Sequence, residues 1–200
     1  MATIKKGAPK RNAAKRSVPK KTARKPARRK MGIDAISLLK ADHREVEKLF
    51  GQIEKTRAAD RKRVLVGKVC EALTVHAKIE EEIFYPQARA ALTRKGDDLL
   101  DEAEVEHDGI KRLVAELKDA DPDEDLYDAR VTVLSEYVKH HVKEEEGDLF
   151  PKVKKSDLDT EKVGAELAAR KEALSGKPVE PPPSLFRRGL QAVGAERAAT

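Results

Sequence analysis

Apolar residues recur at intervals of three and four positions along four long stretches of the chain, which is the periodicity of amphipathic α-helices. In the third stretch, for example, Leu100, Ala103 and Ile110 fall on one face. Gly96 and Pro122 lie in the sequences that separate the later stretches, and both predict turns. The predicted helices cover residues 33–57, 61–92, 97–118 and 124–147. Four long amphipathic helices joined by short loops predict an all-α fold, an antiparallel up-down-up-down four-helix bundle.

The C-terminal part of the chain carries a weaker helical pattern. Residues 157–174 are predicted to form an additional short helix, which Ser156 would cap and Gly176 would end. Three consecutive prolines predict a stiff spacer, and residues 184–200 either dock as a weak amphipathic helix or, as we favour, form a frayed tail. The expected organisation is a disordered tail, a bundle, an additional helix and a Pro-rich linker with a flexible C-terminus, at residues 1–30, 31–155, 156–176 and 177–200.

The composition supports a helical fold and narrows the cellular setting. Charged residues make up 39% of the chain and aromatic residues 4%, with no tryptophan, which favours helices with long polar faces over a large β-sandwich core. The one cysteine, Cys70, excludes an intramolecular disulfide and is expected to be a small core residue. No apolar stretch is long enough for a membrane span and no secretory signal is evident, so we expect a cytoplasmic protein without a membrane partner.

The first thirty residues differ sharply from the rest of the chain. They hold 13 Lys or Arg residues and no acidic residue, whereas residues 31–200 keep 29 of the 42 basic residues and all 36 acidic ones, a balance of −7. Low apolar content, like charges and three prolines predict that this tail is disordered. We favour non-specific binding to nucleic acid, and thus association with the nucleoid, over a solubilising arm or a transit peptide. The expected phosphate contacts are Lys5, Lys6, Lys10, Arg11, Lys15, Arg16, Lys20, Lys21, Arg24, Lys25, Arg28, Arg29 and Lys30.

The histidines form a duplicated pattern. Four of the five fall into two matching sets, in which His43 is followed by His76 and His107 is followed by His141. His76 opens the string HAKIEEEIFYP and His141 opens HVKEEEGDLFP, and the two strings align without a gap from histidine to proline. The distances between equivalent histidines are 64 and 65 residues. This pattern indicates an internal duplication of a helical hairpin.

Helical geometry turns this repeat into a predicted metal site. Residues four apart lie on one face of a helix, so each string presents an imidazole and a carboxylate to one point. Buried ionised carboxylates are costly unless they are paired or bind metal, and two cations would supply the compensating charge. Mixed imidazole and carboxylate ligands suit iron or manganese better than structural zinc. The predicted metal ligands are His43, His76, Glu80, His107, His141 and Glu145.

The motif H…HxxxE…H…HxxxE over residues 33–151 resembles the hemerythrin family, in particular its HHE cation-binding branch. The resemblance implies a non-haem site for two iron ions with a bridging oxo, hydroxo or water ligand, held by these six residues, with manganese as the alternative metal. Oxygen-carrying hemerythrins have a further histidine one turn after the third-helix ligand and an aspartate that ends the fourth-helix pair, where this chain has Lys111 and Glu145. The difference disfavours reversible oxygen transport. It favours either catalase-like peroxide turnover, as in a response to oxidative stress, or a sensor or storage module for oxygen, nitric oxide or iron.

Residues near the predicted ligands have competing interpretations. His140 rivals His141, because Glu144 lies four residues after it, but the gapless alignment favours His141. Tyr137 lies one turn before His141 and either donates a hydrogen bond to a metal-bound oxygen species or is an ordinary core residue. The other glutamates near the motifs are expected on the solvated face, although one of them could support a ligand; they are Glu81, Glu82, Glu144 and Glu146.

Overall fold

The computed structural model describes residues 32–179, and every regular element in that range is helical, as predicted. The predictions for the basic tail and for residues 184–200 lie outside the described residues. No helix in the described range combines the length and apolar character needed to cross a membrane. The elements are α1 (Ala35–Ile53), α2 (Ala59–Ile79), the π-helical η1 (Glu80–Phe84), α3 (Tyr85–Ala91), α4 (Arg94–Lys118), α5 (Tyr127–Glu144), the π-helical η2 (Glu145–Leu149), α6 (Phe150–Val153) and α7 (Thr160–Ser175).

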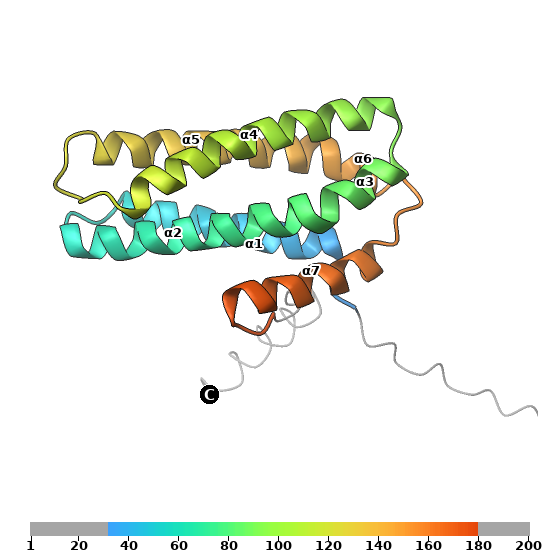
Figure 1. The fold of residues 1–200 in the computed structure, drawn as a ribbon, viewed down its shortest axis with the longest axis horizontal. Helices are drawn as coiled ribbons and strands as arrows, with labels where there is room; N and C mark the ends of the chain where they lie inside the picture. The colour runs from blue at the N-terminus through green and yellow to red at the C-terminus, as the bar shows by residue number, and fades with distance from the viewer. Residues whose placement is uncertain (1–31, 180–200) are drawn as a thin grey trace, which may run out of the picture. The chain divides into compact units, whose positions relative to one another are not determined.

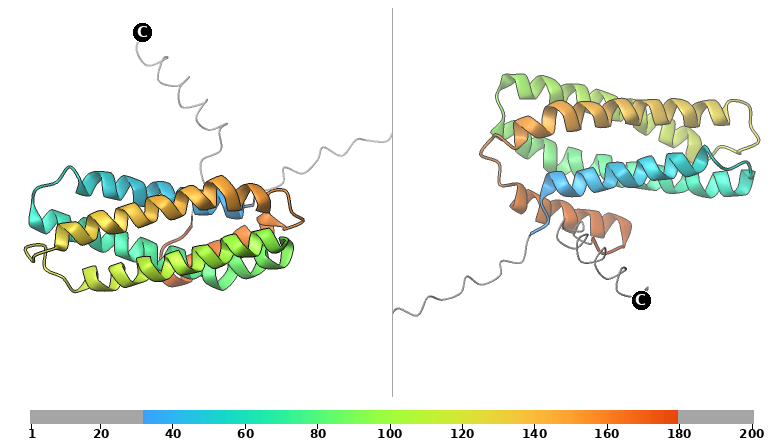
Figure 2. Two further views of the ribbon diagram at one scale, coloured as in Figure 1. Left: turned by 90° about the horizontal axis from the view of Figure 1, so that it is seen from above. Right: turned by 180° about the vertical axis from the view of Figure 1, so that it is seen from behind.

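Four long helices, α1, α2, α4 and α5, lie side by side along the molecule (Figure 1). We call α1 to α3 the first repeat and α4 to α6 the second repeat. α7 packs against the first repeat, where it contacts α1, α2 and η1. Seen from behind, α7 lies beside α1 and on the side away from α4 and α5 (Figure 2). One repeat is therefore covered on its outer side by a further helix, and no described helix covers the other.

The buried side chains form two apolar cores that are separated by a polar layer. One core includes Leu39, Leu100 and Phe150 together with residues of α7. The other includes Phe50 and Leu134 and lies toward the opposite end of the long helices. On each of the four long helices a buried histidine lies at or next to the point where the chain passes from one core to the other. The apolar cores thus hold the polar layer on both sides and exclude water from it.

Both π-helical stretches begin at a glutamate that we predicted as a ligand, Glu80 or Glu145. The sequence pattern did not predict the π-helical geometry itself. In each repeat the glutamate is followed six residues later by a proline, Pro86 or Pro151, which has no backbone N–H to donate. In the first repeat, the residue before that proline is Tyr85. Its backbone N–H donates to the carbonyl of Glu80, five positions back, whereas a regular α-helix would pair it with the carbonyl four positions back. The wider turn is a local insertion of the type that often marks functional sites in helices.

The attachment of α7 depends on a close backbone contact. Val163 and Leu167 are buried against the first repeat, and Gly164 lies between them. A Cβ atom at position 164 would lie 1.8 Å from the carbonyl oxygen of Ile33, so only glycine allows this approach. The helix ends at Gly176, as predicted. This residue has a φ of 65°, a left-handed conformation that glycine adopts easily.

Several predicted helix boundaries differ from the observed ones, and three of them differ for identifiable reasons. The cap of α7 is Asp159, whose carboxylate accepts from the Lys162 N–H, while Ser156 donates its hydroxyl to a carbonyl of the preceding turn. The predicted turn around Gly96 is instead the first turn of α4, because Gly96 packs tightly on Leu92. The fourth long helix begins only after Leu126, which adopts a left-handed conformation with φ 72°. Local sequence does not determine these boundaries, since tertiary packing selects among the available caps.

Candidate metal centre

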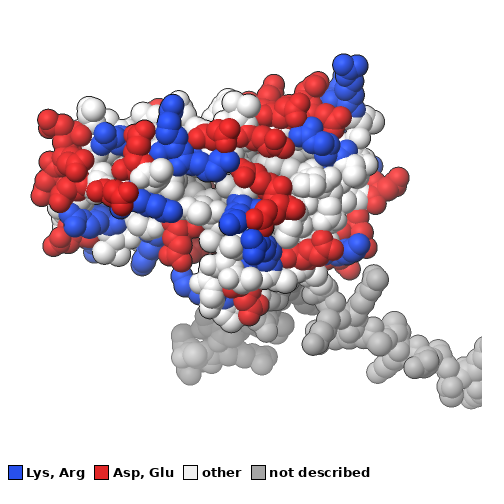
Figure 3. Space-filling model, viewed as in Figure 1, with Lys and Arg blue, Asp and Glu red and all other residues white. Residues whose placement is uncertain are grey.

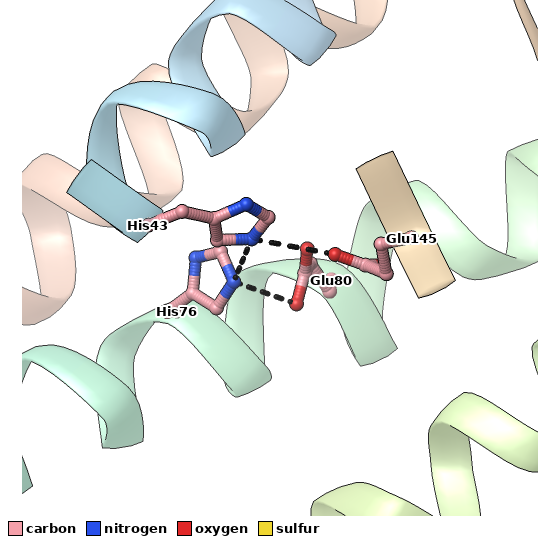
Figure 4. A group of neighbouring side chains, drawn as sticks. All are labelled: His43, His76, Glu80 and Glu145. Carbon is pink, nitrogen blue, oxygen red and sulfur yellow. Dashed lines mark hydrogen bonds and ion pairs between the residues drawn. The ribbon is translucent and has the colours of Figure 1, made fainter. Parts of the chain in front are cut away.

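The structure brings the six predicted ligand residues together in the polar layer. All six are buried, and they belong to two groups that share Glu80. One group joins Glu80 to His43, His76 and Glu145, and within each group the possible ligand atoms lie within 4.8 Å of one another. Figure 4 shows the imidazoles of the first repeat directed toward the carboxylates of Glu80 and Glu145. The other group joins Glu80 to His107 and His141.

The four histidines form two close pairs. The Nε2 atoms of His43 and His76 are 3.1 Å apart, and those of His107 and His141 are 3.2 Å apart. Two ligand atoms that each lie about 2.1 Å from one metal ion are about 3.0–3.4 Å apart at tetrahedral or octahedral angles. Each pair therefore has the separation that two ligands of one ion would have. In each pair, one histidine comes from the first long helix of a repeat and the other from the second long helix of the same repeat.

The two buried glutamates connect the histidine pairs. Glu80 Oε2 lies 3.1 Å from His76 Nε2 and 3.4 Å from His107 Nε2. Glu145 Oε2 lies 3.3 Å from His43 Nε2 and 3.7 Å from His141 Nε2. Each carboxylate thus reaches one histidine of both pairs, which is the arrangement expected of a bridging ligand between two cations.

The polar atoms of this layer are poorly satisfied by the protein itself. Both carboxylate oxygens of Glu80 and the Oε2 atom of Glu145 are buried, and no hydrogen-bond partner for them is found among the described residues. The two Oε2 atoms lie close to histidine nitrogens but do not form hydrogen bonds with them. We therefore interpret the carboxylates and imidazoles as potential ligands that face the same cation position. An unpartnered buried carboxylate is costly, and a bound cation is the compensation that this donor set fits.

Burial and crowding shift the titration of the layer. Burial, together with the charge of Glu145, raises the pKa of Glu80 well above its usual value. Burial acts in the same direction on Glu145, but the nearby histidines, among them His43 at 3.3 Å, outweigh it and lower that pKa to about 2. Burial and the nearby histidines lower the pKa of His107 to about 4, so this imidazole stays neutral near pH 7, as a metal ligand must.

The residue after each buried glutamate supports a histidine of the other repeat. Glu81 Oε1 lies 2.9 Å from His107 Nδ1, and Glu146 Oε1 lies 2.9 Å from His43 Nδ1. A carboxylate can only accept, so each Nδ1 carries the proton and each Nε2 lone pair is directed inward. We expected these glutamates on the solvated face and allowed that one of them could support a ligand; the structure has two supporting glutamates at equivalent positions. The repeated HxxxEE spacing is the signal that could have identified both.

The residue before each opening histidine supports the second histidine of the same repeat. Glu106 Oε2 lies 2.8 Å from His141 Nδ1. Asp42 Oδ2 lies 3.6 Å from His76 Nδ1, an ion-pair distance rather than a hydrogen bond. All four Nδ1 atoms therefore face a carboxylate, which orients the rings and raises their basicity toward a cation.

Tyr85 is a residue of this layer that the sequence interpretation missed. Its side chain is buried, and its hydroxyl donates to Glu145 Oε1 at 3.0 Å and lies 3.3 Å from His107 Nε2. Burial and the nearby carboxylates raise its pKa well above the usual value, so it keeps its proton. The equivalent residue in the second repeat is Phe150, whose ring stacks on His43. The aligned aromatic position before each proline was the available signal.

Tyr137 has neither of the two roles considered for it. It is 44% exposed, and its ring lies over Gly109 on the outer face of the second repeat. His140 is also on the outside, with its side chain 62% exposed, whereas His141 faces the layer. Glu82 is exposed as expected and pairs with Arg170 of α7, and Cys70 is a buried core residue as expected.

Comparison with known proteins places these features in a family. The chain matches the family described as "Hemerythrin HHE cation binding domain" over residues 34–153. It is 28% identical over 168 residues to a DNA nickase of a Nostoc species, in an alignment that covers 83% of this chain but only 44% of the nickase. An uncharacterized protein of Mycobacterium tuberculosis is 26% identical over 151 residues, covering 74% of this chain and 91% of that protein. The crystal structure of a hemerythrin HHE cation binding domain-containing protein from Mycobacterium kansasii matches with a TM-score of 0.62 and 25% identity, covering 72% of this chain and 88% of that chain.

Proposed function

The chain belongs to the hemerythrin HHE cation-binding domain family, and we propose on that premise that its polar layer binds two non-haem iron ions that react with peroxide or oxygen. Each ion would be held by one histidine pair, and the carboxylates of Glu80 and Glu145 would lie between the two ions. We further propose that the long helices follow the up-down-up-down order of an antiparallel bundle. Short connections between consecutive long helices support that order.

The observation that best supports this proposal is the state of Glu80. This carboxylate is fully buried, both of its oxygens are unpartnered, and its pKa is raised by burial. A structural glutamate in a helix core would have a basic or hydroxyl partner. A cation explains the residue, its duplication as Glu145 and the four inward Nε2 atoms at once.

The chain's own residues define how such a centre would act. Two glutamates and four histidines would leave coordination positions open on two ions, and iron, when bound, would supply redox electrons and Lewis acidity to a small oxygen species. The Tyr85 hydroxyl oxygen lies 3.0 Å from Glu145 Oε1 and donates its proton to that atom, which fixes the orientation of the carboxylate. The apolar cores on both sides keep bulk water and larger molecules away from the site.

A second candidate function is binding of a diatomic ligand without turnover, and the enclosure of the centre supports it. The four histidines line a cavity of about 10 Å³ together with apolar side chains such as Val46 and Val138, and apolar cores lie on both sides of the layer. A small uncharged molecule such as oxygen or nitric oxide crosses apolar surroundings more readily than a charged one. A sensor or carrier of a diatomic molecule requires such surroundings.

Anaerobic iron loading followed by peroxide separates these functions. We expect two iron ions per chain after desalting and near-ultraviolet absorption after exposure to oxygen. Sustained oxygen evolution over many turnovers would support the peroxide reaction, whereas a stable adduct spectrum without turnover would support the sensor. A chain that retains no transition metal after careful reconstitution would contradict both. Glu82→Gln, which changes an exposed glutamate two residues after Glu80, is a matched control.

We also propose that residues 1–30 tether the protein to DNA near the nucleoid. The 13 cations of that tail are the support, together with the name of the relative called a DNA nickase. Acidic and basic side chains are interspersed over the face drawn in Figure 3, so this face offers no continuous cationic strip to phosphates. We expect binding to duplex DNA that weakens steeply with salt. A chain lacking residues 1–30 that binds DNA equally well would exclude the tail.

A further inference from the structure

We propose that Glu106, His140 and Glu144 form an outer cation site that takes up a divalent transition-metal ion and passes it to the buried centre. The inference rests on the proposed function, because it requires that the buried centre holds metal. His140 and Glu144 lie on the exposed side of α5, and Glu106 reaches them from α4. The three residues are one of the groups whose possible ligand atoms lie within 4.8 Å of one another.

The distances within this group fit one ion. His140 Nε2 lies 3.2 Å from Glu106 Oε1 and 3.2 Å from Glu144 Oε1. These separations match the value of about 3.0–3.4 Å expected for neighbouring ligands of one ion. His140 and Glu144 also have the i, i+4 spacing of the buried histidine–glutamate pairs. One imidazole and two carboxylates form a donor set suited to Fe²⁺ or Mn²⁺, and solvent supplies the remaining ligands.

Glu106 connects this outer group directly to the buried centre. Its Oε1 atom faces His140, while its Oε2 atom accepts from Nδ1 of His141 at 2.8 Å. A small cavity of about 10 Å³ is lined by Glu106, Glu144 and Glu145, together with apolar side chains. Glu145 is fully buried, and its Oε2 atom has no hydrogen-bond partner among the described residues. A residue of each site therefore lines one water-sized space, and the path that we propose for the ion runs through it.

The first repeat shows that this group is not a by-product of the duplication. The residues equivalent to His140 and Glu144 are Val75 and Ile79, and both are buried in the core that includes α7. The residue equivalent to Glu106 is Asp42, whose outer oxygen is occupied by the ammonium group of Lys171. The protein's own cation thus fills the place that is open in the second repeat.

The alternative is an ordinary pair of surface contacts. An exposed i, i+4 pair contributes little to stability, because water screens its charges. That interpretation explains neither the shared Glu106 carboxylate nor the cavity that Glu144 and Glu145 line together. It predicts that removing His140 and Glu144 has no effect on metal uptake, so the two interpretations can be separated by kinetics.

The test compares iron loading of the full chain with that of the double variant His140→Ala/Glu144→Gln. Metal-free protein is mixed with limiting Fe²⁺ without oxygen, free iron is removed by a chelator at set times, and the bound iron is counted. We expect loading to slow by about tenfold or more, since a charged entry site raises association rates by about 10–10³. The final iron content should be unchanged, because both altered residues lie outside the buried centre. In a titration with Mn²⁺ followed by electron paramagnetic resonance, the double variant should bind one weakly held ion fewer than the unaltered chain.

Glu136→Gln is the matched control, because it removes the same charge one turn before His140 but leaves the outer site intact. Equal loading rates for the full chain and the double variant, with equal numbers of bound Mn²⁺ ions, would overturn the outer site and leave the buried centre standing. Equal slowing by Glu136→Gln would also overturn it, since surface charge alone would then explain the effect. If even the unaltered chain retains no iron, the proposed function itself is wrong, and the outer site falls with it.

Discussion

The two repeats place equivalent residues at the polar layer and differ in what surrounds them. In the first repeat, α7 buries Val75 and places Lys171 on Asp42, so the outer side is closed by protein. In the second repeat, the equivalent positions are the exposed His140 and the shared carboxylate of Glu106. The duplicated features are those that face inward. The surroundings therefore distinguish a closed side of the centre from an open one.

The largest expected effect comes from removing a carboxylate that both histidine pairs share. Glu80→Gln keeps the shape of the side chain but removes its charge, so we expect iron affinity to fall by more than about 100-fold, since even a supporting partner contributes about 10–100-fold. The free energy of unfolding of the metal-free chain should not fall, because a buried unpartnered carboxylate is lost. Iron per chain after desalting and urea unfolding measure the two quantities.

The same change at Glu145 tests whether the two repeats contribute equally. Glu145→Gln should also abolish retention of both ions if each carboxylate lies between them. Retention of one ion in either variant would show that the carboxylates serve separate sites. Retention of two ions in Glu80→Gln would contradict the proposed centre.

The next effect concerns the helix that closes the first repeat. Gly164→Ala places a Cβ atom 1.8 Å from the Ile33 carbonyl oxygen, so α7 must shift, and we expect the free energy of unfolding to fall by about 3 kcal/mol. In the second repeat, Gly109→Ala meets only the half-exposed Tyr137 ring at 3.2 Å, which can move. This variant should gain up to about 1 kcal/mol from helix propensity. Urea unfolding of both variants measures these changes in the free energy of unfolding. An equal loss of stability in the two variants would contradict the proposed difference between the two glycines.

Much of the arrangement was predictable because it depends on periodicity. The helical character followed from apolar residues at intervals of three and four, and the six residues of the layer followed from the aligned strings that begin at His76 and His141. Residues on the inner face of a helix are fixed by its own geometry, so spacing alone brings His76 and Glu80 to one point. Whether these residues bind iron stays a proposal.

The remaining features depend on contacts between elements, which one sequence does not specify. The roles of Glu81 and Glu106 appear only when a neighbouring helix brings a histidine Nδ1 to them. Tyr85 enters the layer because the π-helical turn rotates the residues before Pro86 relative to a regular helix. The four-residue spacing predicted that Tyr137 shares the inner face with His141. In the structure Tyr137 lies on the outer surface of α5, although it is only one turn before His141.

Tyr85 and Phe150 allow the repeats to be made alike. Tyr85→Phe leaves Glu145 Oε1 without its donor, so we expect the free energy of unfolding to fall by about 1–2 kcal/mol. The iron-loaded variant should show a shifted near-ultraviolet spectrum, because the orientation of Glu145 is no longer fixed. The converse variant, Phe150→Tyr, adds a buried hydroxyl beside His43 and should destabilise the chain by a similar amount. An unchanged spectrum and stability for Tyr85→Phe would show that the hydroxyl has no role in the layer.

The smallest effect concerns the ion pair between α7 and the first repeat. Arg170 donates to both oxygens of Glu82, at 2.6 and 3.1 Å, in a contact that is largely open to solvent. Exposed pairs contribute little because water screens them and two long side chains must be ordered. Arg170→Ala should therefore leave both the free energy of unfolding and iron loading almost unchanged. A loss as large as that of Gly164→Ala in urea unfolding would mean that charge, rather than the close backbone approach at Gly164, holds α7 over the closed side of the centre.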